Sequence, residues 1–356
     1  MREGWTSKKL GEVCNIDYGT RVVRSRDGGT IYPVYGGGGA TFKMDSYNRE
    51  DCMVISRFAM SEQCTRFVKG KFFLNDSGLT LSLKNKELNQ EFLNWNILSL
   101  NNTIYSLGRG TAQKNLDTKA FAEITISYPV ELSEQKAIVS RLDSAFAHID
   151  ALKANAEKQL SDAKALFQKA LEKAMEPKEG WEEKKLPDIS ENLDSIRKPV
   201  TKGKRTAGIY PYYGASGIVD YVDDYLFDED LLCISEDGAN LLMRTYPIAF
   251  PISGKVWVNN HAHVLRFKSM ITQKYVEYFF SGMKLDEYIT GAAQPKLTQK
   301  ALNSIIINIP PLSEQQAIVA QLDQLSEKVK RLEEIQEKTI KECDALKQAI
   351  LREVFE

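Results

Sequence analysis

A near-repeat separated by 180 positions constrains the fold of this chain more than any other feature. The run LSEQKAIVSRLD at 132–143 returns as LSEQQAIVAQLD at 312–323, with nine of twelve residues identical. Three other pairs recur in the same order in the two halves: EGWTSKKL and EGWEEKKL, IYPVYGGGGA and IYPYYGASGI, and GTAQKNL and GAAQPKL. The repeating unit is about half of the chain, far longer than a solenoid repeat of roughly 20–50 residues. The chain is therefore a duplicated domain.

Each half opens with a segment of mixed strand and helix patterns. Short apolar or alternating runs predict strands, and apolar residues at helical spacing predict one clear helix in each half. In the first half these are strands at 52–58, 79–84 and 124–129 and a helix at 87–100. In the second half they are strands at 231–235, 255–258 and 263–267 and a helix at 271–283. Each half therefore predicts an α+β globule.

A long helix is predicted after each globule. Ser133 and Ser313 stand where an N-cap is expected, and a glutamate follows each in the first turn, where it suits the helix dipole. Neither 133–176 nor 313–356 contains Gly or Pro, and Pro177 ends the first run. The predicted domains are 1–131, 132–177, 178–311 and 312–356, in which two similar globules alternate with two long helices.

The two helices carry an imperfect heptad pattern. With Leu142 at position a, apolar residues fill most a and d positions, and polar residues interrupt both copies midway. This predicts that the two helices pair with each other along a coiled-coil seam. Other apolar residues lie off this seam and predict a second face that binds a partner, or else rests on the globules of the chain itself. These residues are Ile138, Phe146, Leu160, Phe167, Ile318, Ile335, Ile340 and Leu351.

The charge balance bears on nucleic-acid binding. The net charge is −1, but residues 1–130 carry 17 Lys and Arg against 13 Asp and Glu, or +4, whereas residues 179–311 carry 15 against 17, or −2. A protein that held DNA by net charge alone would be basic in its binding domains. Local patches or a partner must therefore supply the contacts.

The absence of a long apolar run or a signal-peptide core predicts a cytoplasmic chain with no membrane partner.

Four consecutive glycines, Gly36 to Gly39, invite comparison with a phosphate-binding loop. Their spacing matches neither GxGxxG nor GxxxxGK[ST], so nucleotide binding is not expected. A tight turn is one interpretation. The other is a loop whose backbone approaches DNA closely, with Tyr35, Gly36, Gly37 and Lys43 in the first half and Tyr213 in the second.

The histidines do not indicate a metal site. His261 and His263 alternate, but no carboxylate or cysteine pair accompanies them at ligand spacing, so no metal is predicted, and Asn260 and His261 are candidate DNA contacts instead. The sequence has no N-P-P-F/Y tetrapeptide of the kind found in methyltransferases and no G-x-S-x-G. The chain is therefore predicted to be non-catalytic.

Cationic and amide side chains cluster in loops of both halves. Such loops are commonly just solvated, and the repeated loop before each long helix could be a hinge, but phosphate or base contact is the alternative. The candidates are Arg21, Arg24, Arg26, Arg109, Gln113 and Lys114 in the first half and Arg197, Lys198, Lys202, Lys204, Arg205, Gln294 and Lys296 in the second.

The whole chain resembles the specificity subunit of bacterial and archaeal type I restriction-modification systems. The resemblance is carried jointly by IPPLSEQQAIVAQLD, YPVELSEQKAIVSRLD, YPYYGASGIVDYVDD, ISEDGANLL and WVNNHAHVL. It implies that the globules are target-recognition domains for two halves of a split double-stranded DNA sequence. It also implies that the helices form an antiparallel coiled-coil spacer with pseudo-twofold symmetry, which binds methyltransferase subunits, two per chain. The first half departs from the second at Glu131, where the second has Pro311, and in SRFAMSEQC, where the second has SEDGANLLM.

The resemblance assigns the chemistry to other subunits. S-adenosylmethionine would bind the methyltransferase subunit, and ATP and magnesium the restriction subunit, while this chain binds no cofactor. The expected function is recognition of an asymmetric bipartite DNA target. The alternatives are a scaffold whose globules bind proteins, a specificity subunit of a methyltransferase without a restriction partner, and a single-chain enzyme with an unrecognised site.

Overall fold

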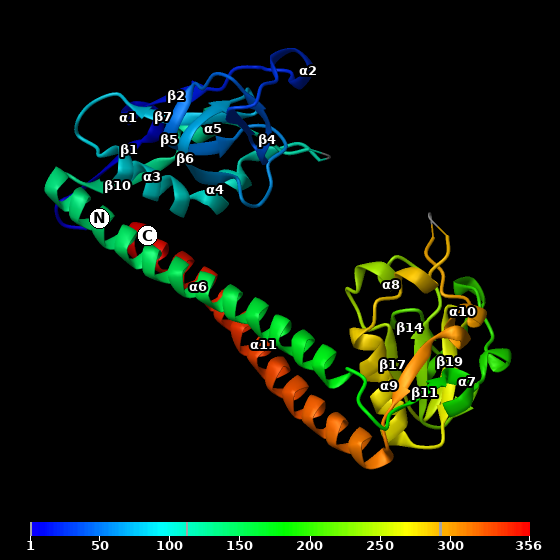
Figure 1. Cartoon of the computed structure of the whole chain (residues 1–356). Coiled ribbons are helices and arrows are strands. Elements are labelled where there is room, and N and C mark those ends of the chain that lie inside the picture. The colour runs from blue at the N-terminus through cyan, green and yellow to red at the C-terminus, as the bar shows by residue number, and fades with distance from the viewer. Residues whose placement is uncertain (1, 112, 292–293) are drawn as a thin grey trace. The chain divides into compact units, whose positions relative to one another are not determined.

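The computed structural model describes residues 2–111, 113–291 and 294–356, whose elements are labelled in Figure 1. It divides into two compact units, Met1–Glu157 with Glu337–Glu356, and Lys158–Gln336. Each unit holds one α+β domain and parts of two long helices, α6 (Leu132–Ala174) and α11 (Leu312–Phe355). Among the described residues, no helix combines the length and the apolar character that a membrane span requires.

The first domain is built on a six-stranded sheet with strand order β2-β7-β5-β6-β3-β4. Neighbouring strands are antiparallel except β3 and β6, which run parallel. The strands are β2 (Cys14–Tyr18), β3 (Tyr32–Gly36), β4 (Gly39–Met44), β5 (Arg49–Ser56), β6 (Thr65–Leu74) and β7 (Gly78–Leu83).

Short elements complete the first domain. Strand β1 (Trp5–Lys9) pairs with β10 (Thr125–Pro129), which brings the two ends of the domain together, and β8 (Gly108–Arg109) pairs with β9 (Asn115–Leu116). The helices are α1 (Leu10–Val13), α2 (Arg24–Asp27), α3 (Gln90–Ser99), α4 (Asn101–Ser106) and α5 (Thr118–Ala122). Leu10, Ile55, Leu79, Phe92 and Phe121 are among the fully buried residues of its core.

The second domain repeats this plan with its sheet divided in two. One four-stranded sheet has the order β12-β19-β16-β17 and the other β14-β13-β18-β15. These strands are β12 (Ser190–Asn192), β13 (Ala207–Gly214), β14 (Gly217–Val222), β15 (Phe227–Asp228), β16 (Leu231–Ser235), β17 (Ala249–Ile252), β18 (Lys255–Val258) and β19 (Ala262–Phe267). Strand β11 (Glu182–Lys185) pairs with β20 (Ile306–Ile309), as β1 pairs with β10. The helices are α7 (Leu186–Ile189), η1 (Asp194–Ile196), η2 (Lys202–Lys204), α8 (Asn240–Met243), α9 (Met270–Gly282), η3 (Asp286–Tyr288) and α10 (Gln299–Ser304).

One glycine in each domain marks the place where the two sheets differ. Gly70 lies within β6 at φ 76°, and Gly254 lies between β17 and β18 at φ 68°. Both angles belong to the left-handed region, which glycine enters without steric cost. The ten-residue β6 continues through this bend, whereas in the second domain two four-residue strands flank it.

The repeated LSEQ run joins each domain to its helix through glutamine. Gln135 is fully buried and donates from Nε2 to the carbonyls of Pro129 at 2.8 Å and Glu87 at 3.0 Å. Gln315 likewise donates to Pro310 at 2.8 Å and accepts from Thr272 at 2.9 Å. A buried amide that has its partners fixes geometry, because leaving it unpaired would be costly.

The predicted N-caps are wrong by two residues. Backbone amides of the first turn of α6 donate to the carbonyl of Glu131, and those of α11 donate to that of Pro311, so the helices begin at Leu132 and Leu312. Ser133 and Ser313 lie inside the first turn. The buried glutamine, rather than the serine, accounts for the repetition of this motif.

The two long helices pack against each other in both units, in antiparallel directions. In the first unit Phe146 of α6 packs with Leu351 of α11, and Lys153 pairs with Asp344 at 2.7 Å. In the second unit Leu171 of α6 joins the same apolar cluster as Ile318 and Leu322 of α11. The antiparallel helix pair that the resemblance implies is therefore present in each unit.

The contact seam of α6 differs from the predicted a and d positions. Buried and half-buried residues of α6 follow a and e instead, among them Leu142, Phe146, Ile149, Lys153, Ala156, Leu160, Ala163 and Phe167. In α11 the a positions are buried or half-buried as predicted, and the d residues Leu325, Leu332 and Thr339 are half-buried like the e residues beside them. The small residues Ala156 and Ala163 at position a allow close approach of the two backbones. Leu152, Leu166 and Leu346 at position d are exposed as a result.

This shift corrects most of the predicted partner-binding face. Phe146, Ile318 and Leu351 are buried within the chain, and Ile138 and Phe167 are half-buried against its own clusters. Contacts within the chain therefore already cover these side chains. Leu160 and Ile340 are half-buried and Ile335 is exposed.

Candidate nucleic-acid interface

The predicted cations of the first domain lie on its surface beside the β3–β4 hairpin. Arg21, Arg24, Arg26 and Lys43 are all exposed. Arg24 and Lys43 line one surface hollow, whose other walls are Gly28, Gly29, Thr30 and Phe42. Arg26 forms an ion pair with Asp27 at 2.9 Å, which leaves the other three cations as the main positive charges of this surface.

The four-glycine run forms the tip of the β3–β4 hairpin. Gly36 and Gly37 are buried, and a Cβ atom on Gly37 would lie 2.8 Å from the carbonyl oxygen of Phe58. Ser56 donates to the Gly37 carbonyl at 2.7 Å, and Tyr35 packs edge-on against Phe72. The expected close approach to DNA is therefore corrected at Gly36 and Gly37, because the close approach there is to the domain's own backbone.

Residues 108–116 of the first domain carry three of the predicted contacts. Arg109 is exposed and forms an ion pair with Asp117, the residue that caps α5. The ammonium group of Lys114 lies 3.9 Å from the centre of the Tyr105 ring, a cation–π arrangement. Gln113 is exposed. The backbone carbonyl of Lys114 accepts from Met60 at 2.9 Å, which ties this loop to the segment that follows β5.

In the second domain, three lysines of the predicted cluster are exposed. Lys198, Lys202 and Lys204 lie on the surface between η1 and β13. Arg205 is only half-exposed, since its guanidinium pairs with Asp220 at 2.9 Å and stacks over Tyr212 at 4.3 Å. Tyr213, the counterpart of Tyr35, is half-buried and stacks on Phe250. The lysines are thus the accessible part of this cluster.

Arg197 has a different environment from the rest of the cluster. Its side chain is only 11% exposed and pairs with Glu236 at 2.7 Å and with Asp194 at 3.2 Å. It also donates to the carbonyl of Ala262 at 2.6 Å. The prediction of an exposed phosphate contact is corrected here, because the guanidinium is committed to partners inside the domain.

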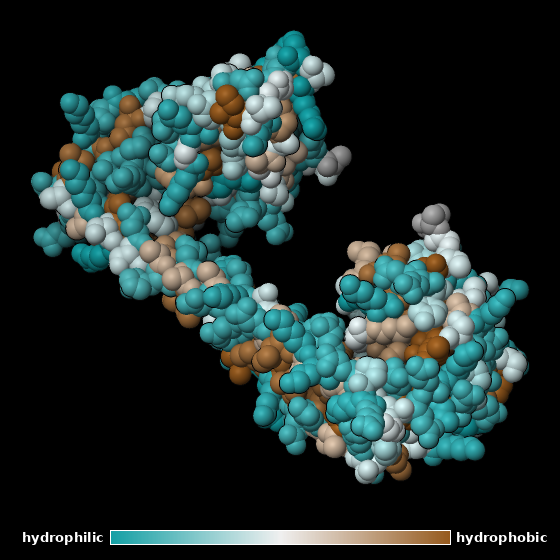
Figure 2. Space-filling model, viewed as in Figure 1, coloured by the Kyte–Doolittle hydropathy of each residue, from teal (hydrophilic) through white to brown (hydrophobic). Residues whose placement is uncertain are grey.

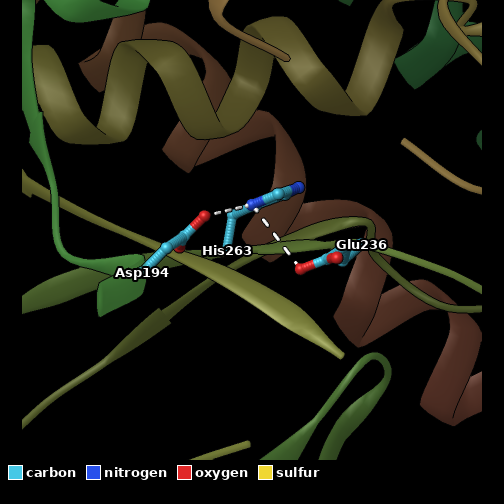
Figure 3. Close-up of side chains that lie close together, drawn as sticks. All are labelled: Asp194, Glu236 and His263. Carbon is cyan, nitrogen blue, oxygen red and sulfur yellow. Dashed lines mark hydrogen bonds and ion pairs between the residues drawn. The ribbon is translucent and has the colours of Figure 1, made fainter. Parts of the chain in front are cut away.

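Arg197 belongs to a buried ionic network centred on His263, and Figure 3 shows His263 between Asp194 and Glu236. Nδ1 of His263 bonds to Asp194 at 2.6 Å and lies 3.8 Å from Glu236. Nε2 bonds to the carbonyl of Leu297 at 2.8 Å. Both ring nitrogens of the buried His263 are therefore engaged, one by a carboxylate and the other by a backbone carbonyl.

The carboxylates of the network are held in their charged form. Burial opposes ionisation of Asp194, but hydrogen bonds from His263 and the Val264 amide and the charge of Arg197 outweigh it, and the pKa of Asp194 lies below its ordinary value. Burial likewise opposes ionisation of Glu236, but Arg197, His263 and Lys296 lower its pKa. Arg197 and Lys296 thus supply the cationic partners of the two carboxylates.

The same three residues have a spacing that a metal ion could bridge. Ligand atoms of Asp194, Glu236 and His263 lie within 4.8 Å of one another. A metal needs a free lone pair on the imidazole, whereas both nitrogens of His263 are engaged by Asp194 and the Leu297 carbonyl. Arg197 and Lys296 already bond to the carboxylates. Within the described part of the chain, this cluster is an ion-pair network rather than a metal centre.

The network lies directly beneath the predicted contact residues of the second domain. Lys296 reaches down to Glu236 at 3.1 Å, and the Leu297 amide donates to the Glu236 carbonyl at 2.8 Å. His261 is exposed and pairs with Asp237 at 2.8 Å. Asn260 and Gln294 are exposed beside them, the latter at the edge of the undescribed residues 292–293. The network therefore brings 236–238, 260–263 and 294–297 together into one surface.

The first domain builds the same position without a buried ionic network. The sheet registers place Leu79 opposite Ile55 where His263 lies opposite Ile234, and Leu116 donates to Arg57 where Leu297 donates to Glu236. Arg57 lies over the Tyr18 ring at 4.8 Å and the Phe58 ring at 4.5 Å. A leucine, two aromatic rings and one arginine thus replace the charged cluster.

Sequence reasoning missed Asp194, Glu236, Arg57 and Tyr18. Their signal was available only through the repeat, because aligning the halves at GTAQKNL and GAAQPKL and at the strands shows opposite charges at Arg57 and Glu236. The contrast between SRFAMSEQC and SEDGANLLM marks the same segment.

Comparison with known proteins agrees with the duplication. The model of the type I restriction modification DNA specificity domain matches residues 2–161 and again residues 178–342. A putative type I restriction enzyme specificity subunit from Haemophilus influenzae is 38% identical over 156 residues, which are 44% of this chain and 40% of that protein. The EcoKI specificity subunit of Escherichia coli is 26% identical over 290 residues, which are 71% of this chain and 62% of that protein. The matches thus span less than two thirds of either relative.

Solved structures with a similar fold cover the whole chain at low identity. A chain from a study of complex assembly and conformational transition of the type I R-M system has a TM-score of 0.76 at 17% identity, covering 99% of this chain and 97% of that one. The HsdS subunit from Thermoanaerobacter tengcongensis has a TM-score of 0.54 at 18% identity, covering 100% and 97%. Together with the family match in both halves, the shared architecture shows that the chain belongs to the family of type I restriction modification DNA specificity domains.

Proposed function

We propose that this chain is a DNA sequence-specificity subunit that reads an asymmetric bipartite target and directs separate methyltransferase and restriction subunits to it. The observation that carries this proposal is the double match to the specificity-domain family, one match for each α+β domain. Because the domains differ in their surface residues, each would read a different half of the target.

The candidate contacts of each domain fall into two chemical kinds with different expected roles. Exposed cations such as Arg21, Arg24 and Lys43 in the first domain, and Lys198 and Lys202 in the second, suit phosphate contact. Gln113, Gln294, Asn260 and His261 have donors and acceptors that suit base edges. The cations would position the DNA, and the amide and imidazole groups would distinguish its bases.

The long helices would serve both as the spacer and as the partner surface. The exposed leucines at position d, Leu152, Leu166 and Leu346, are apolar side chains that a partner could cover. Figure 2 shows apolar patches of this kind along the helices. We propose that they bind methyltransferase subunits, which hold the S-adenosylmethionine, and that a restriction subunit joins through the complex.

The test is methylome sequencing of cells with and without this gene, with its methyltransferase subunit present in both. A bipartite sequence methylated only when the gene is present would support the proposal. Binding of the reconstituted complex to that duplex should be salt-sensitive. If no methylation depends on the gene and the complex does not discriminate among duplexes, a protein-binding scaffold becomes the better interpretation.

A further inference from the structure

A short turn of the second domain is held far more firmly than an ordinary surface loop. We call residues 240–246, which comprise α8 and the three residues after it, the α8 turn. Leu241 anchors it in the main core of the domain. The side chain of Asn240 closes it, because Oδ1 accepts from the Tyr246 amide at 2.9 Å and Nδ2 donates to the Tyr246 carbonyl at 3.0 Å.

Arg244 provides a third anchor, although its backbone conformation is strained. Its backbone lies in the left-handed region at φ 53°, which non-glycine residues seldom adopt. Its guanidinium is half-buried and donates to the carbonyls of Phe280 at 2.8 Å and Met283, at the C-terminal end of α9. Burial lowers the pKa of Arg244 from its ordinary value. The helix end supplies carbonyl dipoles, which favour a cation there.

These anchors present apolar side chains to solvent. Leu242 is 50% exposed, Met243 72% and Tyr246 59%. Figure 2 shows apolar side chains gathered on this part of the second domain, where Figure 1 places α8. A strained, triply anchored turn that exposes three large apolar groups does not serve the stability of the domain. Strain of this kind is typical of sites that bind something.

The neighbours of the turn favour DNA as the ligand. The Gly238 amide donates to the Pro295 carbonyl at 3.0 Å, and Asp237 forms a β-bridge with Lys296, so the turn is continuous with the loop that carries Gln294 and Lys296. Of the acids beside it, Glu236 is paired with Arg197 and Lys296, and Asp237 is in hydrogen-bond contact with His261. The surface around the turn therefore consists of apolar groups bordered by Lys296 and His261.

The aligned segment of the first domain differs at the turn, because Gln63 and Cys64 stand where the second domain has Leu242 and Met243. Gln63 is polar and exposed, and Cys64 is buried. The apolar turn is therefore specific to one half of the chain, as a group that distinguishes one half-site from the other would be.

We propose that the α8 turn is an apolar base-reading element of the second domain, in which Leu242 and Met243 contact base edges and thymine methyl groups in one half-site. Apolar side chains recognise the thymine methyl in the major groove. This inference rests on the proposed function and adds specificity residues to it. Arg244 and Asn240 act as positioning residues that hold the turn before DNA arrives.

The test compares the wild-type chain, the double variant Leu242→Ser with Met243→Ser, and the single variant Met243→Gln, each co-expressed with the methyltransferase subunit. The control variant is Ile306→Ser, an exposed apolar residue on β20. Methylome sequencing should show relaxed base preference only in the half-site read by the second domain, with the other half-site and the gap unchanged. At the affected base pairs, discrimination measured with duplexes that replace each base, including thymine by uracil, should fall about tenfold.

Three outcomes would contradict this inference. Unchanged discrimination in both variants would exclude base contact by the turn. Loss of methyltransferase binding in size-exclusion chromatography, with DNA discrimination intact, would assign the turn to protein docking. Equal loss at both half-sites, or an unfolding temperature lowered in both variants but not in the control, would give it a structural role. Methylome sequencing with the wild-type chain distinguishes these outcomes from failure of the proposed function. If the proposed function is wrong, no methylation will depend on the gene even with the wild-type chain.

Discussion

Gln336 on α11 donates a hydrogen bond from Nε2 to Oε1 of Gln159 on α6 at 2.9 Å, a polar pair within an otherwise apolar helix contact. Gln336 is buried at position a, where a polar residue lowers the stability of a coiled coil and specifies its register. In this chain the register is also fixed by ion pairs on either side, Lys153 with Asp344 and Lys164 with Glu333.

Gln336→Leu should therefore stabilise the chain without changing the target. Burial of the leucine side chain should raise the free energy of unfolding by about 1–2 kcal/mol, since the exposed Gln159 can turn to water. Thermal unfolding of the complex and methylome sequencing are the measurements. A shifted gap between half-sites would show that the glutamine pair alone sets the register.

The exposed and buried cations of the cluster 197–205 should behave differently. Replacing Lys198, Lys202 and Lys204 by Gln should weaken binding to all sequences and reduce the slope of log affinity against log salt by about three. The control replaces three exposed lysines of α11, Lys328, Lys330 and Lys341. A slope equal to that of the control would make the cluster a solvated loop.

Arg197→Gln should instead destabilise the second domain. The substitution removes positive charge from beside the buried Glu236 and Asp194. Removing one partner of a buried ion pair lowers the free energy of unfolding by about 3 kcal/mol. Unfolding of the full chain followed by circular dichroism measures this effect. A normal unfolding temperature combined with a lower salt slope would instead assign Arg197 to phosphate contact.

The ionic network should make the stability of the second domain depend on acid. The pKa values of Asp194 and Glu236 are below their ordinary values in the folded chain. The stabilisation from these groups is therefore complete above an unfolded pKa of about 4 and is lost as pH falls through the folded pKa values. Glu236→Gln should lower the unfolding temperature at pH 7, and the difference from wild type should shrink below about pH 4. A difference independent of pH would show that the charge of Glu236 does not matter.

The exposed leucines at position d should contribute to methyltransferase binding. Leu152→Ser and Leu166→Ser should each leave the helix contact intact, since neither side chain lies in it, while weakening association with the methyltransferase subunit. Burying such a side chain contributes about 1.5–3 kcal/mol, so association weaker by roughly 10- to 150-fold is expected. Titration of the two subunits, with Lys158→Ser as the polar control, measures it. Association equal to the control would place the partner surface elsewhere.

Insertion of one heptad after Ala156 and one after Gln336 should lengthen both helices together. A heptad adds about 10.5 Å, close to three base pairs of rise. If the helices set the spacing, both half-sites should persist in the methylome while the gap between them changes. A folded, active insertion variant with an unmoved gap would exclude this function for the helices.

The duplication, the long helices and several strands were predictable because they follow from repetition, absence of Gly and Pro, and apolar patterning. Strand β16 and strand β18 lie at the expected residues. The hairpins β3–β4 and β13–β14 were missed, because their tyrosine- and glycine-rich sequences match a turn as well as a strand.

The candidate interface was less predictable, for two reasons. Arg197 looks like its neighbours Lys198 and Lys202, and only the tertiary position of Glu236, 39 residues away, shows that it is committed inside the domain. The a and e seam likewise depends on where the domains cover each helix. Periodicity alone could not show that Leu152 faces solvent while Phe146 does not.

The glutamine joints have a consequence for how new specificities could arise. Gln135 and Gln315 hold the end of each domain through a proline carbonyl, and neither contact involves a candidate DNA-reading residue. A gene segment encoding another domain with the same terminal strand and proline could therefore be exchanged at either joint by recombination. The long helix would bind the exchanged domain without a change in the helix sequence, and the cell would acquire a new half-target in one genetic event.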